Sequence, residues 1–254
     1  MDTLTEARKI GLIIIGDEIL SGKRQDKHLT QTNALLKPRG LLVDWVWMIR
    51  DDETSLVEAF RYSFSRNHIV FSFGGIGATA DDKTRQCVAK ALGVDLTLHQ
   101  GAAEEIINKF GDKAYPQRIT MAEFPAGSEM IPNAYNRVAG FSIHEHYFMP
   151  GFPIMAKGML DWILNRYYND LSRPISVEKS ILITDGHEGE WIDFMAEFEK
   201  TNPNCRIFSL PTVTENDGRN VEIGVEGLEP EVSEHFIKII EKAKSLQANF
   251  KVVD

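Results

Sequence analysis

A glycine-rich turn between a predicted strand and a predicted helix is the segment of this sequence best suited to chemistry. It reads GGIGATADDKT and directly follows the apolar run His68–Phe73. Its glycines allow positive-φ turns and let a ligand approach the backbone, and the helix start that follows favours a phosphate group. The segment matches neither the P-loop nor the complete GxGxxG pattern. The ligand-binding residues that we predict here are Gly74, Gly75, Gly77, Thr79 and Thr84.

Two carboxylates end this turn, and two interpretations of them are open. Asp81 and Asp82 stand where the helix is expected to begin. Capping of the helix N-terminus is a frequent and sufficient reason for an aspartate at such a position. The alternative is a metal ligand or a general base, and the spacing alone does not decide between the two.

Acidic residues also follow the two preceding predicted strands. The loop Gly16–Gly22 (GDEILSG) follows the first strand, and Arg50–Glu53 (RDDE) follows the second. Because the C-terminal ends of parallel strands line the ligand crevice, we expect both loops to converge on the glycine-rich turn. Carboxylate oxygens suit Mg²⁺ or Mn²⁺ bridged to phosphate, so we predict a divalent cofactor, and the hydrolase hypothesis below adds Co²⁺ to these two candidates. For each single acid, helix capping or a solvated loop is the alternative.

Histidine, serine and cysteine offer weaker candidates. His144 and His146 alternate on an extended segment and could form a metal pair, although we favour exposed hairpin side chains. His187 precedes a helix and is interpreted as a turn residue. No GxSxG pattern indicates a serine nucleophile. Cys87 falls within the helix after the glycines and is expected to be buried.

The elements that must position these residues alternate between strand and helix. The predicted strands are Lys9–Ile15, Leu41–Ile49 and His68–Phe73, and the predicted helices are His28–Leu36, Asp52–Phe64 and about Asp82–Leu92. This alternation predicts an α/β protein with a doubly wound, mostly parallel sheet and right-handed crossovers. Residues 115–153 contain five prolines and are expected to form loops and a hairpin around Ser142–Phe148. In a following helix, Ile154–Tyr168, the stripe Met155, Met159, Trp162 and Ile163 indicates core packing.

A second, smaller domain is expected after the linker Asp170–Pro174. The predicted order is strand Ser180–Thr184, helix Glu190–Lys200, strands Cys205–Pro211 and Asn220–Gly224, and helix Glu231–Leu246. This βαββα order predicts a small α+β module with a hairpin turn at Asn216–Arg219. The domains are therefore predicted as residues 1–170 and 175–254.

Composition and charge limit the partners. The 254 residues are 43% hydrophobic and 26% charged, which is ordinary for a globular protein. The net charge of −9, with no cluster of Lys and Arg, argues against binding nucleic acid. No apolar segment is long enough for a membrane span, and two cysteines, Cys87 and Cys205, fit a reducing compartment. We expect a cytoplasmic protein with no membrane partner.

An ordered set of these motifs resembles a known family. From about Ile10 to Asn165 the sequence is similar to the molybdenum-cofactor-biosynthesis, or molybdopterin-binding, domain superfamily, and its nearest branch is the CinA-type (competence/damage-inducible protein A) proteins. The motifs are GDEILSG, Asp26, Gly40, Asp51-Asp52, GGIGATADDKT, AEFPAGSEMIPN, AGF and PGFP. The second domain resembles the small KH-like domain of those proteins. The sequence stops before the C-terminal amidase domain that many of them carry, so amidase activity is not expected.

The resemblance implies a three-layer α/β/α fold with a protruding β-hairpin and a homo-oligomer, either a dimer or a trimer. It implies a small phosphorylated ligand, nucleotide- or pterin-like, bound across the glycine-rich turn, with molybdopterin among the candidates. By the same resemblance, Asp51 and Asp82 are the catalytic residues and metal ligands. The supporting ligand-binding residues are Gly16, Asp17, Glu18 and Ser21.

Three departures from the family pattern bear on which ligand is bound. Two prolines of the usual GGLGPTPDD turn are Ala78 and Ala80 here. An asparagine that could bind ligand is replaced by His28. The pair Asn136-Arg137 stands where the family more often has Gly-Thr.

Three functions remain open on this basis. We favour a metal-dependent pyrophosphatase acting on ADP-ribose- or FAD-type dinucleotides. The alternatives are a molybdopterin-binding protein of cofactor assembly and a nucleotide-binding scaffold or regulator without catalysis. Resemblance in fold does not by itself decide among them.

Overall fold

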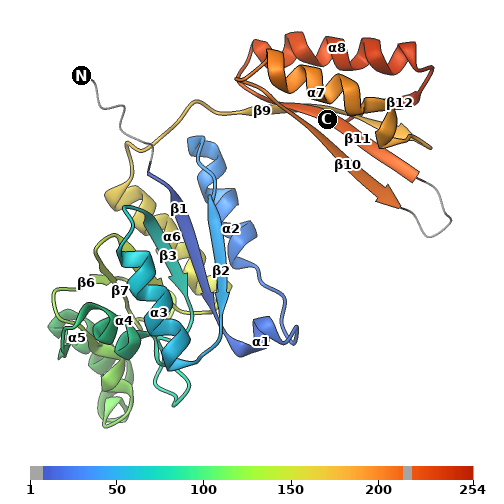
Figure 1. Ribbon diagram of the computed structural model, residues 1–254. Coiled ribbons are helices and arrows are strands. Elements are labelled where there is room, and N and C mark those ends of the chain that lie inside the picture. Colours follow the sequence, from blue (N-terminus) through green and yellow to red (C-terminus); the bar gives the residue numbers. More distant parts are fainter. Residues whose placement is uncertain (1–7, 214–218, 254) are drawn as a thin grey trace. The chain divides into compact units, whose positions relative to one another are not determined.

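A computed structural model of the protein describes residues 8–213 and 219–253. The chain forms two compact units, one ending at Ser172 and the other beginning at Arg173 (Figure 1). This division lies inside the linker expected at Asp170–Pro174. The predicted hairpin turn at Asn216–Arg219 falls outside the described residues, apart from Arg219 itself.

The large unit is built on a six-stranded sheet in the order β2-β1-β3-β8-β7-β6. The strands are β1 (Ile10–Ile15), β2 (Trp45–Ile49), β3 (Ile69–Phe73), β6 (Glu129–Ile131), β7 (Gly140–Ile143) and β8 (His146–Met149). Strands β2, β1, β3 and β8 run parallel to one another, and β7 runs antiparallel to both of its neighbours. The predicted mostly parallel α/β sheet is confirmed.

Helices cover both faces of this sheet and make three layers (Figure 1). Side chains of β1 alternate between the two cores, with Ile13 and Ile15 on one side and Leu12 and Ile14 on the other. Burial on both faces explains why this strand is apolar throughout. Helices α3 (Glu53–Phe64), α4 (Thr84–Leu92) and α5 (Gln100–Phe110) cover the first face, and α2 (His28–Leu36) and α6 (Pro153–Tyr167) cover the second.

Several boundaries differ from the sequence prediction. Helix α4 begins at Thr84 rather than Asp82, and β2 begins at Trp45 rather than Leu41. The expected hairpin is formed by β7 and β8, and β8 also pairs with β3, so the hairpin extends the central sheet. The elements of the large unit that the sequence did not indicate are α1 (Asp17–Leu20), α5, β4 (Leu96–Leu98), β5 (Glu123–Pro125), β6 and the short 3₁₀ segments Lys37–Arg39, Gly111–Ala114 and Arg118–Ala122.

The small unit has two layers. Its sheet has the order β10-β11-β9-β12, and all neighbouring strands are antiparallel. The elements are β9 (Val177–Thr184), a 3₁₀ segment (Glu188–Trp191), α7 (Ile192–Thr201), β10 (Arg206–Val213), β11 (Arg219–Gly227), α8 (Glu231–Ser245) and β12 (Asn249–Val253). The predicted βαββα order is confirmed, and β12 adds a fourth strand beside β9.

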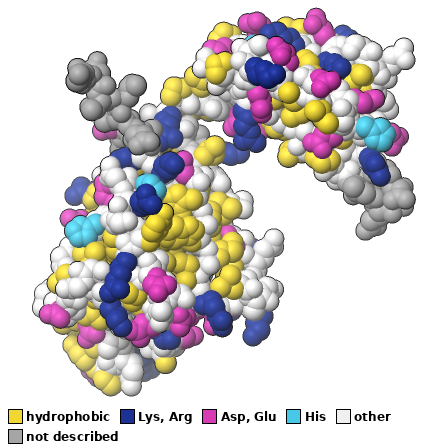
Figure 2. Space-filling model, in the orientation of Figure 1, with side chains coloured by type: hydrophobic (Ala, Val, Ile, Leu, Met, Phe, Trp, Pro, Cys, Tyr) yellow, Lys and Arg dark blue, Asp and Glu magenta, His cyan; other side chains and the backbone are white. Residues whose placement is uncertain are grey.

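One apolar core joins the sheet of the small unit to its helices. Trp191, Ile223 and Ile239 are almost fully buried in it. On the visible face of this unit, Lys and Arg side chains are interspersed with Asp and Glu side chains (Figure 2). Across the part of the chain that the structure describes, every helix is too short or too polar to cross a membrane.

His146 corrects the expectation of two exposed histidines. It lies on β8 between β3 and β7, and its side chain is buried, whereas His144 is exposed in the turn before it. Its Nδ1–H donates to the carbonyl oxygen of His144 at 2.9 Å, and its Nε2 lies 2.7 Å from Ser63 Oγ. Burial lowers the pKa of His146 from the usual 6.5 to about 4, and the hydrogen bond to His144 offsets only part of this effect.

This burial predicts a pH dependence of stability between pH 6.5 and about 4. The unfolded chain takes up a proton at His146 near pH 6.5, but the folded chain does so only near pH 4, so stability falls as the pH drops through this window. Between pH 7 and pH 5, this residue should lower the free energy of unfolding by about 2 kcal/mol. Urea unfolding at both pH values measures the change.

The matched variants are His146→Gln and His144→Gln. The first should lose this part of the pH dependence, and the second should keep it because His144 is exposed. Equal losses of stability between pH 7 and pH 5 in the wild type and His146→Gln would contradict the assignment.

Candidate functional site

The ends of three parallel strands meet at Gly74. This glycine has φ 109°, and a Cβ there would lie 2.3 Å from the carbonyl oxygen of Ile15 at the end of β1. Its N–H donates to Met149 O at the end of β8, at 2.9 Å. Gly151 packs on the same atoms, since a Cβ on it would lie 3.4 Å from Gly74 Cα. The strand ends can approach this closely only because Gly74 has no side chain.

The turn after Gly74 has its carbonyl groups held toward α4. The Thr84 hydroxyl donates to Gly74 O at 3.0 Å, and the Thr84 amide donates to Gly75 O at 2.9 Å. The buried Arg85 guanidinium donates to Ile76 O at 2.6 Å and to Gly77 O at 2.8 Å. Four consecutive carbonyl oxygens are therefore occupied by groups of one helix.

The amide groups of the same turn are left without partners. Within residues 8–213 and 219–253, the N–H groups of Gly75, Ile76 and Gly77 have no hydrogen-bond acceptor. A backbone amide needs an acceptor, and all three of these residues line the cavity described below. Three adjacent free amides make a site into which an anion can be accepted.

Asp82 closes the turn, which corrects the helix-capping interpretation. Its Oδ2 accepts hydrogen bonds from the Thr79 amide at 2.9 Å and from the Thr79 hydroxyl at 2.5 Å. Helix α4 has Lys83 at its N-cap position and no capping side chain. The carboxylate also occupies the space beside Gly77, where a Cβ would lie 2.4 Å from Asp82 Oδ2.

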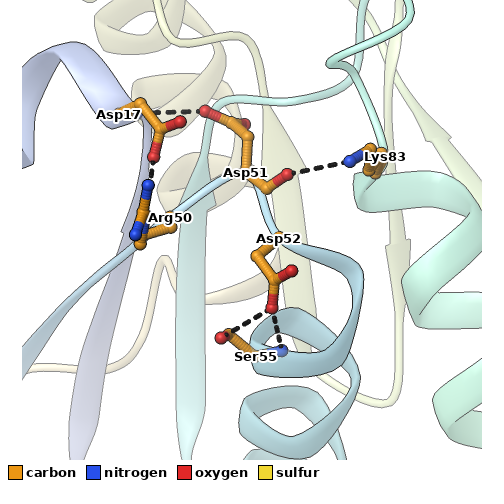
Figure 3. Close-up of polar contacts among 6 residues, drawn as sticks. All are labelled: Asp17, Arg50, Asp51, Asp52, Ser55 and Lys83. Atoms are coloured by element: carbon orange, nitrogen blue, oxygen red, sulfur yellow. Dashed lines mark hydrogen bonds and ion pairs between the residues drawn. The ribbon is translucent and has the colours of Figure 1, made fainter.

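Asp51 is joined to the loop that follows β1 (Figure 3). Its Oδ2 accepts the amide of Asp17 at 3.1 Å, and its carbonyl oxygen accepts from Lys83 Nζ at 3.1 Å. Its neighbour Asp52 has a different role, since it caps α3 by accepting from the amide and the hydroxyl of Ser55, both at 2.9 Å. Of the two adjacent acids, only Asp51 faces the cavity described next.

The surroundings of Asp51 hold its proton more tightly than water would. Burial raises the pKa of this carboxyl, and the nearby carboxylates of Asp17, Glu18 and Asp81 raise it further. The hydrogen bond from the Asp17 amide acts in the opposite direction. A carboxylate with a raised pKa is a better proton acceptor, which is a common property of residues at functional sites.

A cavity of about 450 Å³ opens where these loops converge. Eight of the residues predicted from the sequence line it: Gly16, Glu18, Asp51, Gly74, Gly75, Gly77, Thr79 and Asp82. Three predicted residues lie elsewhere. Asp17 is exposed and ion-paired with Arg50 at 3.3 Å, Ser21 is the exposed C-cap of α1, and Thr84 is buried beneath the turn.

The rest of the lining was not among the predicted site residues, although Asp81 was considered as a metal ligand or general base. It comprises Ile15, Arg24, Ile76, Ala78, Asp81, Met121, Asn136, Val138, Pro150, Gly151, Phe152 and Met155. Met155 corrects a prediction, because it faces the cavity while the other methionine of its stripe, Met159, is buried in the core. For Asn136, the departure from the family pattern was the available signal. For Arg24, no pattern in the sequence was informative.

His28, another departure from the family pattern, supports the cavity wall from behind. Its ring is buried and stacks on Phe73, with the ring centroids 4.4 Å apart, and its Nε2 lies 3.3 Å from Gly151 O. Burial lowers the pKa of this imidazole. The neutral ring therefore donates from Nε2 and fixes Gly151, one of the lining residues.

The acids of the cavity suit a metal ion only in combination with a ligand. Among the described residues, no group of three or more His, Cys, Asp or Glu is placed to hold a metal. Mg²⁺ in particular is often held by one or two carboxylates together with phosphate oxygens and water. Asp51 and the neighbouring carboxylates fit this arrangement, in which the protein supplies one or two ligands and the phosphate and water supply the others.

Comparison with known proteins identifies the family. The model of a family described as a probable molybdopterin binding domain matches residues 11–169. The chain belongs to this family, and the resemblance predicted from the sequence is confirmed. The large unit is thus a member of a family of small-molecule-binding domains.

Individual proteins with similar sequences are consistent with this family membership. A CinA-like protein from Anaeromyxobacter sp. (strain Fw109-5) is 35% identical over 165 residues, which is 62% of this chain and 40% of that protein. This chain therefore spans less than half the length of that relative. A protein from Caldivirga maquilingensis is 28% identical over 92% of this chain and 96% of its own length, so the similarity extends over both units.

Among solved structures, the crystal structure of the CinA protein, of unknown function, from Thermoplasma acidophilum is similar. The TM-score is 0.57 and the identity 28%, over 63% of this chain and 97% of that chain. The match confirms the three-layer fold of the large unit.

The hydrogen bonds from Arg85 to the carbonyl oxygens of the turn predict that replacing this residue lowers the stability of the fold. Arg85→Met keeps the aliphatic stem but leaves the carbonyl oxygens of Ile76 and Gly77 without donors. The free energy of unfolding should fall by about 3 kcal/mol, as expected for two hydrogen bonds from a buried charged group. Urea unfolding measures this change.

The control is Arg61→Met on the exposed side of α3, which should change stability by about 0.5 kcal/mol or less. If Arg85→Met is as stable as this control, the guanidinium does not hold the turn.

Proposed function

We propose that the large unit binds a phosphorylated small molecule with its phosphate groups on the turn Gly74–Gly77. The observation that carries this proposal is the row of three amides without acceptors, at Gly75, Ile76 and Gly77, on the wall of a cavity. Phosphate oxygens are strong acceptors and match such a row. The family to which the chain belongs is consistent with a pterin- or nucleotide-like ligand.

The charges of the cavity support binding of the phosphate together with a divalent cation. Its lining contains four carboxylates, from Glu18, Asp51, Asp81 and Asp82, against the single guanidinium of Arg24. A diphosphate entering alone would meet net repulsion. When bound with the ligand, Mg²⁺, Mn²⁺ or Co²⁺ would supply the missing positive charge and polarise the phosphoryl oxygens.

We propose further that the unit hydrolyses the pyrophosphate bond of ADP-ribose- or FAD-type dinucleotides. In this reaction a water oxygen bonds to one phosphorus, and the bridging oxygen leaves with the other phosphate. Asp51 is suited to accept the proton of that water because its pKa is raised by burial and by neighbouring carboxylates. Asp82 fixes the turn through Thr79 and presents its carboxylate to the same cavity.

The description of the family favours a second candidate, a molybdopterin-binding protein. Calorimetric titration with molybdopterin and with its adenylylated form tests it. A dissociation constant in the micromolar range or below would support this role, and absence of binding at high micromolar ligand would remove it. Binding of dinucleotides without turnover would instead indicate a scaffold or regulator.

The hydrolase proposal predicts which acids matter. Asp51→Asn and Asp82→Asn keep an oxygen that can accept the hydrogen bonds from the Asp17 and Thr79 amides, so the loops should stay folded while the charge is lost. Turnover of ADP-ribose or FAD should fall by about 100-fold or more in each variant. The assay measures product release with Mg²⁺, Mn²⁺ and Co²⁺ in turn.

Asp52→Asn is the matched control, since this adjacent acid caps α3 outside the cavity and asparagine caps equally well. Its activity should stay within about twofold of the wild type. A wild type that is inert with every substrate and metal of the panel would reject the hydrolase. Full activity in Asp82→Asn would show that Asp82 only braces the turn.

A further inference from the structure

Part of the cavity wall is apolar and lies apart in sequence from the glycine-rich turn. It is formed by Met121, Val138, Phe152 and Met155, which come from three separate segments of the chain. Thioethers and aliphatic groups bind the face of a flat ring well, because they are polarizable and carry no competing hydrogen bonds. The phosphate turn and this wall border a single cavity of about 450 Å³.

One polar side chain, Asn136, interrupts the apolar wall, and its oxygen is fully used. Asn136 Oδ1 accepts from Asn133 Nδ2 at 2.8 Å and from the Val138 amide at 2.9 Å. An amide oxygen has two acceptor sites, so neither remains for a ligand. The Asn136 amide nitrogen lies on the other side, 3.4 Å from Met155 Sδ, a weak acceptor.

The surrounding loop fixes this orientation. Asn133 is 5% exposed, and its Nδ2 also donates to Val138 O at 3.0 Å while its Oδ1 accepts from the Tyr135 amide at 3.1 Å. If the Asn136 amide were reversed, its NH₂ group would face two other donors, the Val138 N–H and the Asn133 NH₂. Asn136 can therefore only donate a hydrogen bond toward the cavity.

We propose that Asn136 determines ligand specificity by donating a hydrogen bond to an acceptor atom on a planar heterocycle held against Met155 and Val138. The acceptor is a carbonyl oxygen or an unprotonated ring nitrogen, since only such atoms complement a fixed N–H. This assignment rests on the proposed binding of phosphate at Gly74–Gly77. The ligand class becomes a heterocycle-bearing phosphate, and a sugar phosphate without a ring lacks the matching group.

Asn136 and its neighbour Arg137 differ in what they contact. Arg137 points to a different partner, because its guanidinium pairs with Glu105 at 3.1 Å. Asn136 alone of the two lines the cavity.

The test compares phosphates with and without a ring. Calorimetry with Mg²⁺ present gives dissociation constants for AMP, GMP, FMN and ribose 5-phosphate, and the ratio of each ring-bearing constant to that of ribose 5-phosphate isolates the contribution of the ring. In the wild type, at least one ring-bearing probe should bind about tenfold or more tightly than ribose 5-phosphate.

Asn136→Asp keeps an oxygen for the Val138 and Asn133 donors but replaces the donating NH₂ with an acceptor. It should reduce the preference for the ring by about tenfold or more, and any added repulsion of phosphate cancels in the ratio. Asn136→Gly removes the donor without adding charge and should reduce the preference in the same direction. Arg137→Lys, outside the cavity lining, is the control and should preserve it.

Each outcome decides the matter. If ribose 5-phosphate binds the wild type as tightly as every ring-bearing probe, or if both Asn136 variants keep the wild-type ratio within twofold, the assignment of Asn136 is wrong while phosphate binding stands. If none of the four probes binds the wild type, phosphate binding at the turn fails and the assignment fails with it.

Discussion

The close approach of three strand ends at Gly74 is the constraint on which the site depends. The carbonyl of Ile15, the carbonyl of Met149 and the backbone of Gly151 all lie against this glycine, and a Cβ would be 2.3 Å from the first of them. With the strand ends fixed, the following turn folds onto α4, where Thr84 and Arg85 take up its carbonyl oxygens. The amides that remain are what makes the edge of this sheet a binding site.

The negative charge of the carboxylates around the cavity also limits what the site can bind. The amides favour an anion, yet the neighbouring acids of Glu18, Asp51 and Asp81 oppose one unless a cation accompanies it. Burial and the same neighbouring carboxylates raise the pKa of Asp51. The Asp51 carboxylate is therefore a stronger proton acceptor than an isolated one. A metal-bound diphosphate would satisfy both the amides and the carboxylates.

The backbone of the site followed from the sequence more readily than its walls. Apolar runs such as Ile10–Ile15 are buried on both faces, so their pattern predicts parallel strands directly. The glycine-rich turn comes directly after one of these strands, so its position at the edge of the sheet could be predicted as well. Met155 and Asn136 could not be placed, because their exposure depends on contacts between segments distant in sequence. The same holds for the burial of His146 and for Asp82, whose partner Thr79 lies in a turn without helical pattern. The residue type of Asp82 suggested a helix cap, but in the folded chain its carboxylate accepts hydrogen bonds from Thr79 instead.

The central claim is that the amides of Gly75, Ile76 and Gly77 hold the phosphate groups of the ligand. Amide hydrogen exchange, measured with and without ADP-ribose and Mg²⁺, tests it most directly, because exchange reports on each N–H itself. We expect slower exchange on ligand addition concentrated in residues 75–77, with weaker effects on the helix α4 behind them. Unchanged exchange in this turn while the ligand protects another part of the chain would contradict the account.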